Sequence, residues 1–460
     1  APTNRPSQIQ LTNESAIPSP MLVMEAPISC APVNVIAPIS AIIPIPLAHT
    51  ESQRVWICHQ IAPAAIIPSI TQRLSAISAI HISVADQFVS IPPASVKSHG
   101  QISKHLGKQA QRLEKVALEE EQAGHKSTAF DLYYRASAKF AAAQHPVLET
   151  NDEKIYLHGR CIANFEKVIE LAPYTIERVE IPFEDMQLQC NFFLCPGVDV
   201  APTMIFIPGC DMTKEMWPDP KVVEAHARGM HLLVIDGPGQ GMSNIRNQKL
   251  THGNYERAVL KIVDWLETRP EVDKDKIGIF AVSMGSHWGL EVAASGDPRI
   301  KGVVGPWASY LDKYYILDTF SPRYKQLFGY LTGASSEEEL DKIVAQMTVE
   351  GREKDIKCPI LLTVGEYDSR SPVELVYNFY DKVTAPKELW VYEDTYHQAV
   401  MFKGTGQDRH DCHMMCMDWL VDVFNGKITA GHNKKMYLRT NGSGPNAKQG
   451  ENKDARNWWE

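Results

Sequence analysis

The sequence predicts an α/β fold, in which a mostly parallel sheet is covered by helices on both faces. Short β-branched runs alternate with helical segments after Pro173, and charged amphipathic helices precede them. A third observation is a buried run that turns sharply at Ser283 into a helix. A chain of 460 residues has room for two or three structural units.

Composition excludes several classes of protein. Lys and Arg number 46 against 55 Asp and Glu, a formal charge of −9, which lacks the basic surface that nucleic acids require. Prolines interrupt the most apolar stretch, 21–47, so it predicts neither a membrane span nor a signal peptide. The nine cysteines form no CxxC pair, which favours a reducing compartment. We therefore expect a cytoplasmic protein without a nucleic-acid or membrane partner.

Residues 1–100 differ in composition from the rest. They hold 13 of the 30 prolines, only 8 charged residues, and no glycine before Gly100. Frequent prolines interrupt helices and remove hydrogen-bond donors from strands. We predict an irregular extension outside the functional fold.

A helical segment is expected over residues 101–172. Its three helices are predicted at Lys104–Gln122, Ser127–Gln144 and Asn151–Leu171 from apolar residues spaced by three and four. No second copy follows at a fixed period, which argues against a repeat array.

The predicted sheet domain covers residues 173–430 and contains eight strands. The first two strands form a hairpin, and the later ones alternate with helices. The expected strands are Thr175–Phe183, Gln187–Cys195, Thr203–Ile207, His231–Ile235, Lys276–Val282, Lys301–Val304, Pro359–Val364 and Glu388–Tyr392. The long interval at about 307–355 predicts an inserted cap with a helix near Glu337–Met347. Residues 431–460 are predicted to form a polar tail.

The segment around Ser283 matches a nucleophile elbow, a strained strand-to-helix turn that exposes a serine. The residue two positions before such a serine and the residue two positions after it must be small. Gly285 satisfies this requirement, and Ala281 replaces the usual first glycine.

A serine needs a base and an acid to become a nucleophile. In folds with this elbow, the acid and then the histidine follow the serine in the chain. Asp368 follows the seventh predicted strand and His397 follows the eighth. Glu366 remains an alternative acid, and His410 and His413 remain alternative bases.

Two backbone N–H groups are expected to hold the negative charge that develops on a carbonyl oxygen. Met284 directly follows the nucleophile, and Cys210 lies in the loop after the third strand, with Asp211 as the next choice. The turn Asp236–Gly241 has no P-loop lysine, so we expect it to shape the floor of a pocket. No metal site is predicted.

Five stretches together resemble one branch of the α/β-hydrolases. They are Pro208–Glu215, the turn Asp236–Gly241, the elbow at Ser283, Gly365–Asp368 and Tyr396-His397. The branch includes 2,6-dihydroxypseudooxynicotine hydrolase, fungal polyketide-shortening hydrolases of pigment pathways and bacterial fermentation-respiration switch proteins. The resemblance covers 101–427, and it departs from the family pattern at Ala281 and Cys210.

This resemblance implies an α/β-hydrolase fold, with an eight-stranded, mostly parallel sheet, an N-terminal helical lid and an inserted cap. It implies a cofactor-free serine hydrolase that cleaves a C–C bond next to a carbonyl, or an ester, in an aromatic or polyketide-like small molecule. We expect Trp307, Tyr310 and Tyr314 in the cap to bind that substrate by stacking. A generic carboxylesterase or thioesterase and a non-catalytic small-molecule receptor are the alternatives. A homodimer is left open.

Overall fold

The computed structural model describes residues 95–308, 310–319, 321–398, 410–440 and 442–446. The chain divides into two units, Ala1–Pro63 and Ala64–Glu460, and every described residue belongs to the second. The predicted extension up to residue 94 and the end of the predicted tail lie outside the described residues.

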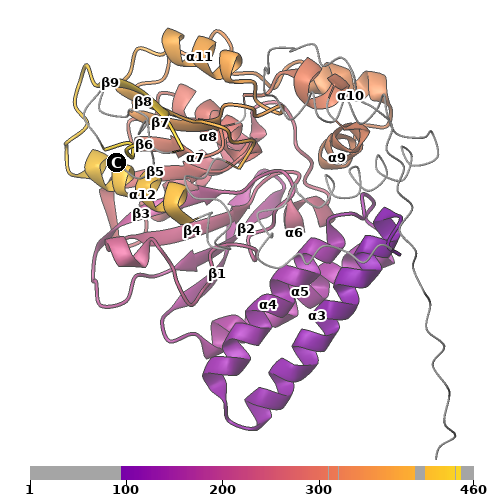
Figure 1. Cartoon of the computed structure of the whole chain (residues 1–460). Coiled ribbons are helices and arrows are strands. Elements are labelled where there is room, and N and C mark those ends of the chain that lie inside the picture. The colour runs from indigo at the N-terminus through magenta and orange to yellow at the C-terminus, as the bar shows by residue number, and fades with distance from the viewer. Residues whose placement is uncertain (1–94, 309, 320, 399–409, 441, 447–460) are drawn as a thin grey trace, which may run out of the picture. The chain divides into compact units, whose positions relative to one another are not determined.

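A nine-stranded sheet forms the centre of this unit, in the order β1-β2-β4-β3-β5-β6-β7-β8-β9 (Figure 1). β2 pairs antiparallel with β1 and β4, and every other pairing is parallel. The strands are β1 Ile176–Phe183, β2 Met186–Phe193, β3 Ala201–Ile207, β4 His231–Asp236, β5 Val272–Ala281, β6 Ile300–Gly305, β7 Ile360–Gly365, β8 Lys387–Tyr392 and β9 Asn433–Leu438. The α/β-hydrolase fold class is confirmed.

Both faces of the sheet are covered, because alternate side chains of a strand point to opposite faces. In β3, Ile205 and Ile207 belong to one apolar cluster, whereas Met204 and Phe206 belong to the other. The first cluster also contains α7 (Asn254–Leu266) and α8 (Met284–Ala294). The second also contains α12 (His410–Phe424) and the helical segment.

The helical segment comprises α3 (His99–Gln122), α4 (Lys126–Gln144) and α5 (Asp152–Leu171), which pack side by side (Figure 1). Ser98 and Asn151 cap α3 and α5 by accepting hydrogen bonds from backbone N–H groups three residues further on. α4 packs between α3 and α5, and almost all residues of its second half are buried.

The interval between β6 and β7 contains η3 (Tyr314–Thr319, a π-helical turn), α9 (Pro322–Thr332) and α10 (Glu337–Val344). Ser321 and Ser336 cap the last two helices, and Pro322 occupies the first helical position of α9. The shorter helices α6 (Gly241–Ile245) and α11 (Val373–Lys382) complete the elements used below.

The ninth strand corrects the prediction of eight strands and of a polar tail from residue 431. β9 pairs in parallel with β8 over six residues. Its sequence, NKKMYL, begins with three polar residues, and Met436 and Leu438 are buried on one face. The alternation is real but spans too few residues to stand out in a polar segment.

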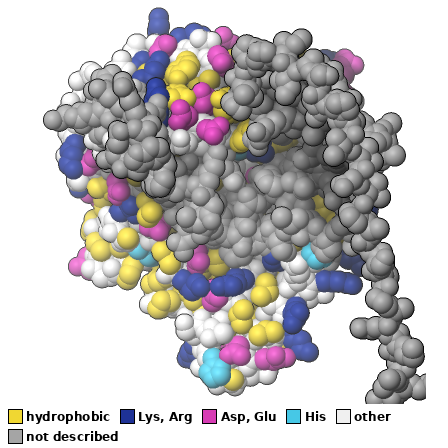
Figure 2. Space-filling view, in the orientation of Figure 1, with side chains coloured by type: hydrophobic (Ala, Val, Ile, Leu, Met, Phe, Trp, Pro, Cys, Tyr) yellow, Lys and Arg dark blue, Asp and Glu magenta, His cyan; other side chains and the backbone are white. Residues whose placement is uncertain are grey.

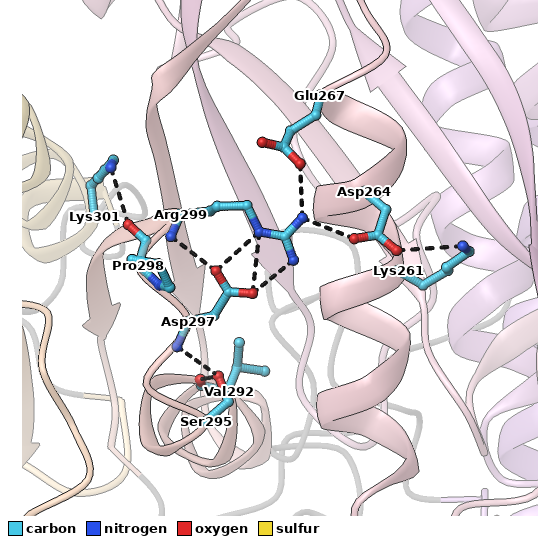
Figure 3. A network of polar contacts seen from close by, with 9 residues as sticks. All are labelled: Lys261, Asp264, Glu267, Val292, Ser295, Asp297, Pro298, Arg299 and Lys301. Atoms are coloured by element: carbon cyan, nitrogen blue, oxygen red, sulfur yellow. Dashed lines mark hydrogen bonds and ion pairs between the residues drawn. The ribbon is translucent and has the colours of Figure 1, made fainter.

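Surface charges link the helices around the sheet. Arg299 binds Asp297 with two side-chain nitrogens and also contacts Asp264 (2.9 Å) and Glu267 (2.8 Å) on and just after α7 (Figure 3). This network ties the turn after α8 to α7. Over the helical segment, basic and acidic side chains are interspersed (Figure 2). None of the helices in the described part of the chain is long and apolar enough to cross a membrane.

Candidate active site

The turn between β5 and α8 places Ser283 in a strained backbone conformation. Its φ is 56° and its ψ is −127°, a region that side chains other than glycine rarely occupy. The serine follows the carboxyl end of a buried strand and immediately precedes the first residue of α8. The backbone geometry is that of a nucleophile elbow.

Close backbone contacts explain the small residues around this serine. A Cβ at Gly285 would lie 2.3 Å from the Ile207 carbonyl oxygen, so only glycine fits there. On the other side, the Ala281 methyl group lies 3.0 Å from the position that a Cβ at Gly289 would take. The glycine in α8 therefore gives Ala281 the room that the usual glycine at position 281 would otherwise provide.

Ser283, His397 and Asp368 form one hydrogen-bonded line, although they are far apart in the sequence. Ser283 Oγ lies 2.7 Å from His397 Nε2, and His397 Nδ1 lies 2.7 Å from Asp368 Oδ2. The three residues follow the carboxyl ends of β5, β7 and β8. This arrangement can move a proton from the hydroxyl to the imidazole, with the carboxylate orienting the ring. The catalytic role of the three residues stays a prediction.

Burial tunes the histidine for that task. His397 is 8% exposed, and desolvation lowers its pKa below 6.5. The nearby Arg370 guanidinium also lowers the pKa, while Asp368 opposes both effects. The neutral imidazole therefore predominates at pH 7, which is the form that accepts a proton. Asp368 Oδ1 is occupied by the backbone N–H groups of Arg370 (2.9 Å) and Ser371 (3.3 Å).

The alternative acid and one alternative base lie elsewhere. Glu366 accepts hydrogen bonds from the Asp394 N–H (3.0 Å) and the Tyr437 hydroxyl (2.7 Å). His413 is 4% exposed and packs against the rings of Phe280 and Trp307. The His410 side chain lies outside the described residues.

The two expected oxyanion donors lie on either side of Ser283. Met284 is the first residue of α8, where backbone N–H groups have no acceptor within the helix. Cys210 follows Gly209, and a Cβ at Gly209 would lie 3.3 Å from the Ser283 Cβ. We call residues 207–213 the oxyanion loop. Burial raises the pKa of the Cys210 thiol well above its usual value, so the thiol stays protonated.

Gln240 anchors the oxyanion loop from the turn after β4. Its Nε2 donates to the Gly209 carbonyl at 2.7 Å, and its Oε1 accepts from the Tyr255 hydroxyl at 2.5 Å. Tyr255 in turn stacks on Trp288 of α8, with ring centres 4.2 Å apart. The sequence suggested only a pocket floor for this turn. The glutamine among its glycines was the available signal for an anchoring side chain.

A buried ionic network lies beyond the same loop. Lys214 Nζ is 2.5 Å from Glu215 Oε1 and 3.0 Å from Asp236 Oδ2, and all three side chains are fully buried. The Lys214 and Met242 N–H groups also donate to the Asp236 carboxylate, at 2.8 and 3.0 Å. Lys214 stays charged, because both carboxylates raise its pKa against desolvation. The network joins the oxyanion loop to the end of β4.

The three aromatic residues predicted to bind substrate do not share one surface. Trp307 is 1% exposed and packs in the core against His413, with ring centres 4.7 Å apart. Tyr314 is 59% exposed and contacts the ring of Tyr315. Tyr310 is half-buried against Phe379. The sequence showed the aromatic content of the cap but not which of its faces are buried, and substrate binding by these three residues stays a prediction.

Among the described residues, no group of three or more His, Cys, Asp and Glu side chains could hold a metal ion.

Arg370, which the sequence reasoning missed, extends toward the cap, and its guanidinium lies 5.8 Å from the ring centre of Tyr324 in α9. Its position two residues after Asp368 was the only signal in the sequence.

Fold and site geometry together define the class: this chain is an α/β-hydrolase in fold. The family model for acetyl xylan esterase (AXE1) matches residues 209–409, which include most of the oxyanion loop and all three residues of the hydrogen-bonded line.

Two curated relatives illustrate the homology. The 2,6-dihydropseudooxynicotine hydrolase of Paenarthrobacter nicotinovorans is 27% identical over 321 residues, covering 67% of this chain and 79% of the relative. The α/β hydrolase ucsC of an Acremonium species is 30% identical over 237 residues, covering 47% of this chain. That alignment spans about half of the fungal relative, 48% of its length. The resemblance to this branch is confirmed, and its members found here are named hydrolases.

A solved structure supports the fold independently. The crystal structure of 2,6-dihydroxy-pseudo-oxynicotine hydrolase superposes with a TM-score of 0.65 at 23% identity. The match covers 78% of this chain and 98% of that one.

Proposed function

We propose that this chain is a cofactor-independent serine hydrolase of small carbonyl compounds, with Ser283, His397 and Asp368 as its catalytic triad. The observation that carries the proposal is the unbroken line of two 2.7 Å hydrogen bonds from the Ser283 hydroxyl to the Asp368 carboxylate. The positive φ of Ser283 supports it, because strained backbone is a feature of functional sites.

The residues present perform the reaction as follows. His397 Nε2 takes the proton of Ser283 Oγ as the oxygen attacks the substrate carbonyl carbon. The backbone N–H groups of Met284 and Cys210 stabilise the resulting oxyanion. When the tetrahedral intermediate collapses, the bond to the leaving group breaks and His397 returns the proton to that group. Water, activated by the same imidazole, then releases the acyl group from Ser283.

The leaving group decides which bond is cleaved. We propose cleavage of a C–C bond next to a carbonyl, in which the leaving group is a stabilised carbanion or enolate. Support comes from the homology to 2,6-dihydropseudooxynicotine hydrolase, which spans 79% of that protein. Esterase activity is the second candidate, supported by the acetyl xylan esterase model over residues 209–409. The same triad serves both reactions.

A fluorophosphonate probe tests the activated serine directly. We expect the protein to be labelled, and the labelling to disappear in Ser283→Ala. Ser286→Ala is the matched control, because Ser286 lies in the first turn of α8 and its hydroxyl donates to the Ser283 carbonyl instead. Absence of labelling in the unmodified protein would refute an activated serine.

A paired substrate panel then separates the two reactions. An aryl β-diketone and an aryl ester that carry the same acyl group differ only in the leaving group, which is an enolate in the first and a phenolate in the second. We expect turnover of the diketone, detected as the acid and the methyl ketone by mass spectrometry. Turnover of the ester alone would assign the chain to the esterases.

A further inference from the structure

A small polar recess lies where the helical segment, the oxyanion loop and the cap helix α9 meet. Its volume is about 20 Å³, enough for one group the size of a water molecule. The side chains that matter for its chemistry are Gln144, His145, Lys154, Asp211, Gln240 and Tyr330. They come from four separate parts of the chain, so the recess exists only in the folded protein.

Lys154 of α5 is the unusual member. It is only 5% exposed, and its Nζ donates to the carbonyl oxygens of Gln144 (3.1 Å) and Val147 (3.0 Å). An ammonium group has three donors, so one is left for another partner. Burial of a cation costs several kcal/mol unless an anion compensates it.

Two more cations surround the same place. The Lys154 and Lys249 ammonium groups lie 4.7 and 5.0 Å from the ring centre of Tyr330. Arg323 at the start of α9 donates to the Pro146 carbonyl oxygen. Within the described part of the chain, no carboxylate forms an ion pair with any of the three. Burial, and then repulsion by Arg323 and Lys249, lowers the pKa of Lys154 to about 7, and an incoming anion would raise it again.

A purely structural role accounts for part of this arrangement. Gln144 ends α4, so Lys154 caps its last carbonyl, which also accepts from the Val147 N–H at 3.1 Å, and the Val147 carbonyl beyond the helix. This role does not explain why the Lys249 ammonium lies over the same ring as Lys154, or why Arg323 lies near enough to Lys154 to lower its pKa. Nor does it explain Gln144 Oε1, which is buried and makes no hydrogen bond within the described structure. Unsatisfied polar atoms of this kind are costly, and they favour a ligand with a hydroxyl or amide N–H.

The recess is within reach of the proposed nucleophile. Cys210 and Asp211 of the oxyanion loop form part of its wall. In α9, Tyr324 lies beside Arg370 and Tyr330 lines the recess. At a rise of 1.5 Å per residue, the two tyrosines are about 9 Å apart along the helix. A substrate of two or three fused or linked rings covers that distance.

We propose that this recess binds an acidic oxygen of the substrate, a carboxylate, enolate or phenolate, while the carbonyl of the same molecule lies at Ser283. The inference rests on the proposed function and adds a charge requirement to it: the substrate is an anion. Lys154 pairs with the oxygen, Lys249 and Arg323 supply the surrounding positive charge, and Gln144 accepts a hydrogen bond from a neighbouring donor.

The test measures equilibrium binding to the Ser283→Ala protein, so it does not depend on turnover. The probes are 2-naphthoate and its neutral counterpart 2-naphthamide, titrated by calorimetry. We expect the carboxylate to bind about tenfold more tightly than the amide, and this preference to vanish in Lys154→Met. Lys108→Met, a change at an exposed lysine of α3, is the control that should keep it.

Lys154→Met also removes a helix cap, so Lys249→Met provides a second variant that leaves that cap in place. We expect it to reduce the preference for the carboxylate by severalfold. Equal affinities for naphthoate and naphthamide in the parent protein would overturn the recess proposal and indicate that the cavity holds water only. A failed fluorophosphonate label with a retained carboxylate preference would instead refute the proposed catalysis and leave the recess standing.

Discussion

Beside the sheet, after the loop that follows β3, buried Lys214 has two ionic partners, whereas buried Lys154 of the helical segment has none among the described residues. Lys214 is 1% exposed and contacts Glu215 and Asp236. Glu388 in β8 similarly accepts hydrogen bonds from two tryptophans and His432. In α5, Lys154 donates to two carbonyl oxygens and lies over the ring of Tyr330, and neither partner carries a negative charge.

The histidine of α5 repeats this contrast. His158 is 1% exposed, and neither of its ring nitrogens has a hydrogen-bond partner in the described structure. Burial lowers its pKa to about 3. The buried charged groups in and beside the sheet thus have partners of opposite charge. The buried lysine and histidine of α5 have no such partner among the described residues, so burial favours their uncharged forms. The two regions should therefore respond differently to mutation and to acid.

The largest effect on activity is expected from the three residues that follow the carboxyl ends of β5, β7 and β8. Ser283→Ala and His397→Ala should each lower kcat by about 10⁴-fold or more, with Asp368→Asn somewhat milder, because the three act as one unit. Steady-state kinetics with circular dichroism as a folding control would measure this. Near-normal turnover in His397→Ala, together with loss in His413→Ala, would move the base to another element.

Removing the buried lysine should destabilise the fold next most strongly. Lys214→Met leaves two buried carboxylates without a cation, and we expect the free energy of unfolding to fall by about 3–5 kcal/mol. Urea denaturation measures the change. Adding Asp236→Asn should recover part of the loss. If the single variant were as stable as its parent, the sheet charges would not depend on one another.

Acid should act on the helical segment through His158. Its pKa is 6.5 when unfolded and about 3 when folded, so the unfolded state takes up the proton first as pH falls. Stability is therefore complete above pH 6.5 and declines toward pH 3, with about 2 kcal/mol lost from this residue at pH 5. His158→Gln and His158→Phe cannot titrate and should both flatten the pH dependence by that amount. An unchanged dependence in both would contradict the assignment.

The exposed network should matter least. Arg299→Met breaks contacts with Asp264, Glu267 and Asp297, yet the arginine is partly in solvent. We expect the free energy of unfolding to fall by about 1 kcal/mol, measured as a small decrease in Tm. High salt should shrink this difference in Tm, because it screens the ion pairs of the parent protein. A loss as large as that of Lys214→Met would erase the distinction between buried and surface pairs.

The fold was largely predictable, because local patterns determine its elements. All eight expected strands and the three N-terminal helices occur within a few residues of their predicted bounds. β9 was missed because its pairing with β8 supplies the stability that its polar sequence does not indicate. Tertiary contacts overrode a weak local signal there.

The site was predictable only where chain order constrains it. An elbow serine requires an acid and a histidine at later strand ends, which pointed to Asp368 and His397. Gln240 and Lys154 act through groups that packing brings to them, the Gly209 carbonyl and the Tyr330 ring, and no spacing in the sequence reveals such pairs. The environments of Trp307 and Tyr314 likewise depend on which face of the cap is buried.

The position of β9 also has a genetic consequence. Tyr437 in this strand holds Glu366, and Glu366 holds the backbone of Asp394, three residues before His397. A stop codon just before Asn433 would spare the whole Ser–His–Asp line, yet it would remove the strand that pairs with β8 and the hydroxyl at the start of this relay. Truncations that remove β9 should therefore behave as loss-of-function alleles, whereas the polar composition of residues 431–460 suggests that this segment is dispensable.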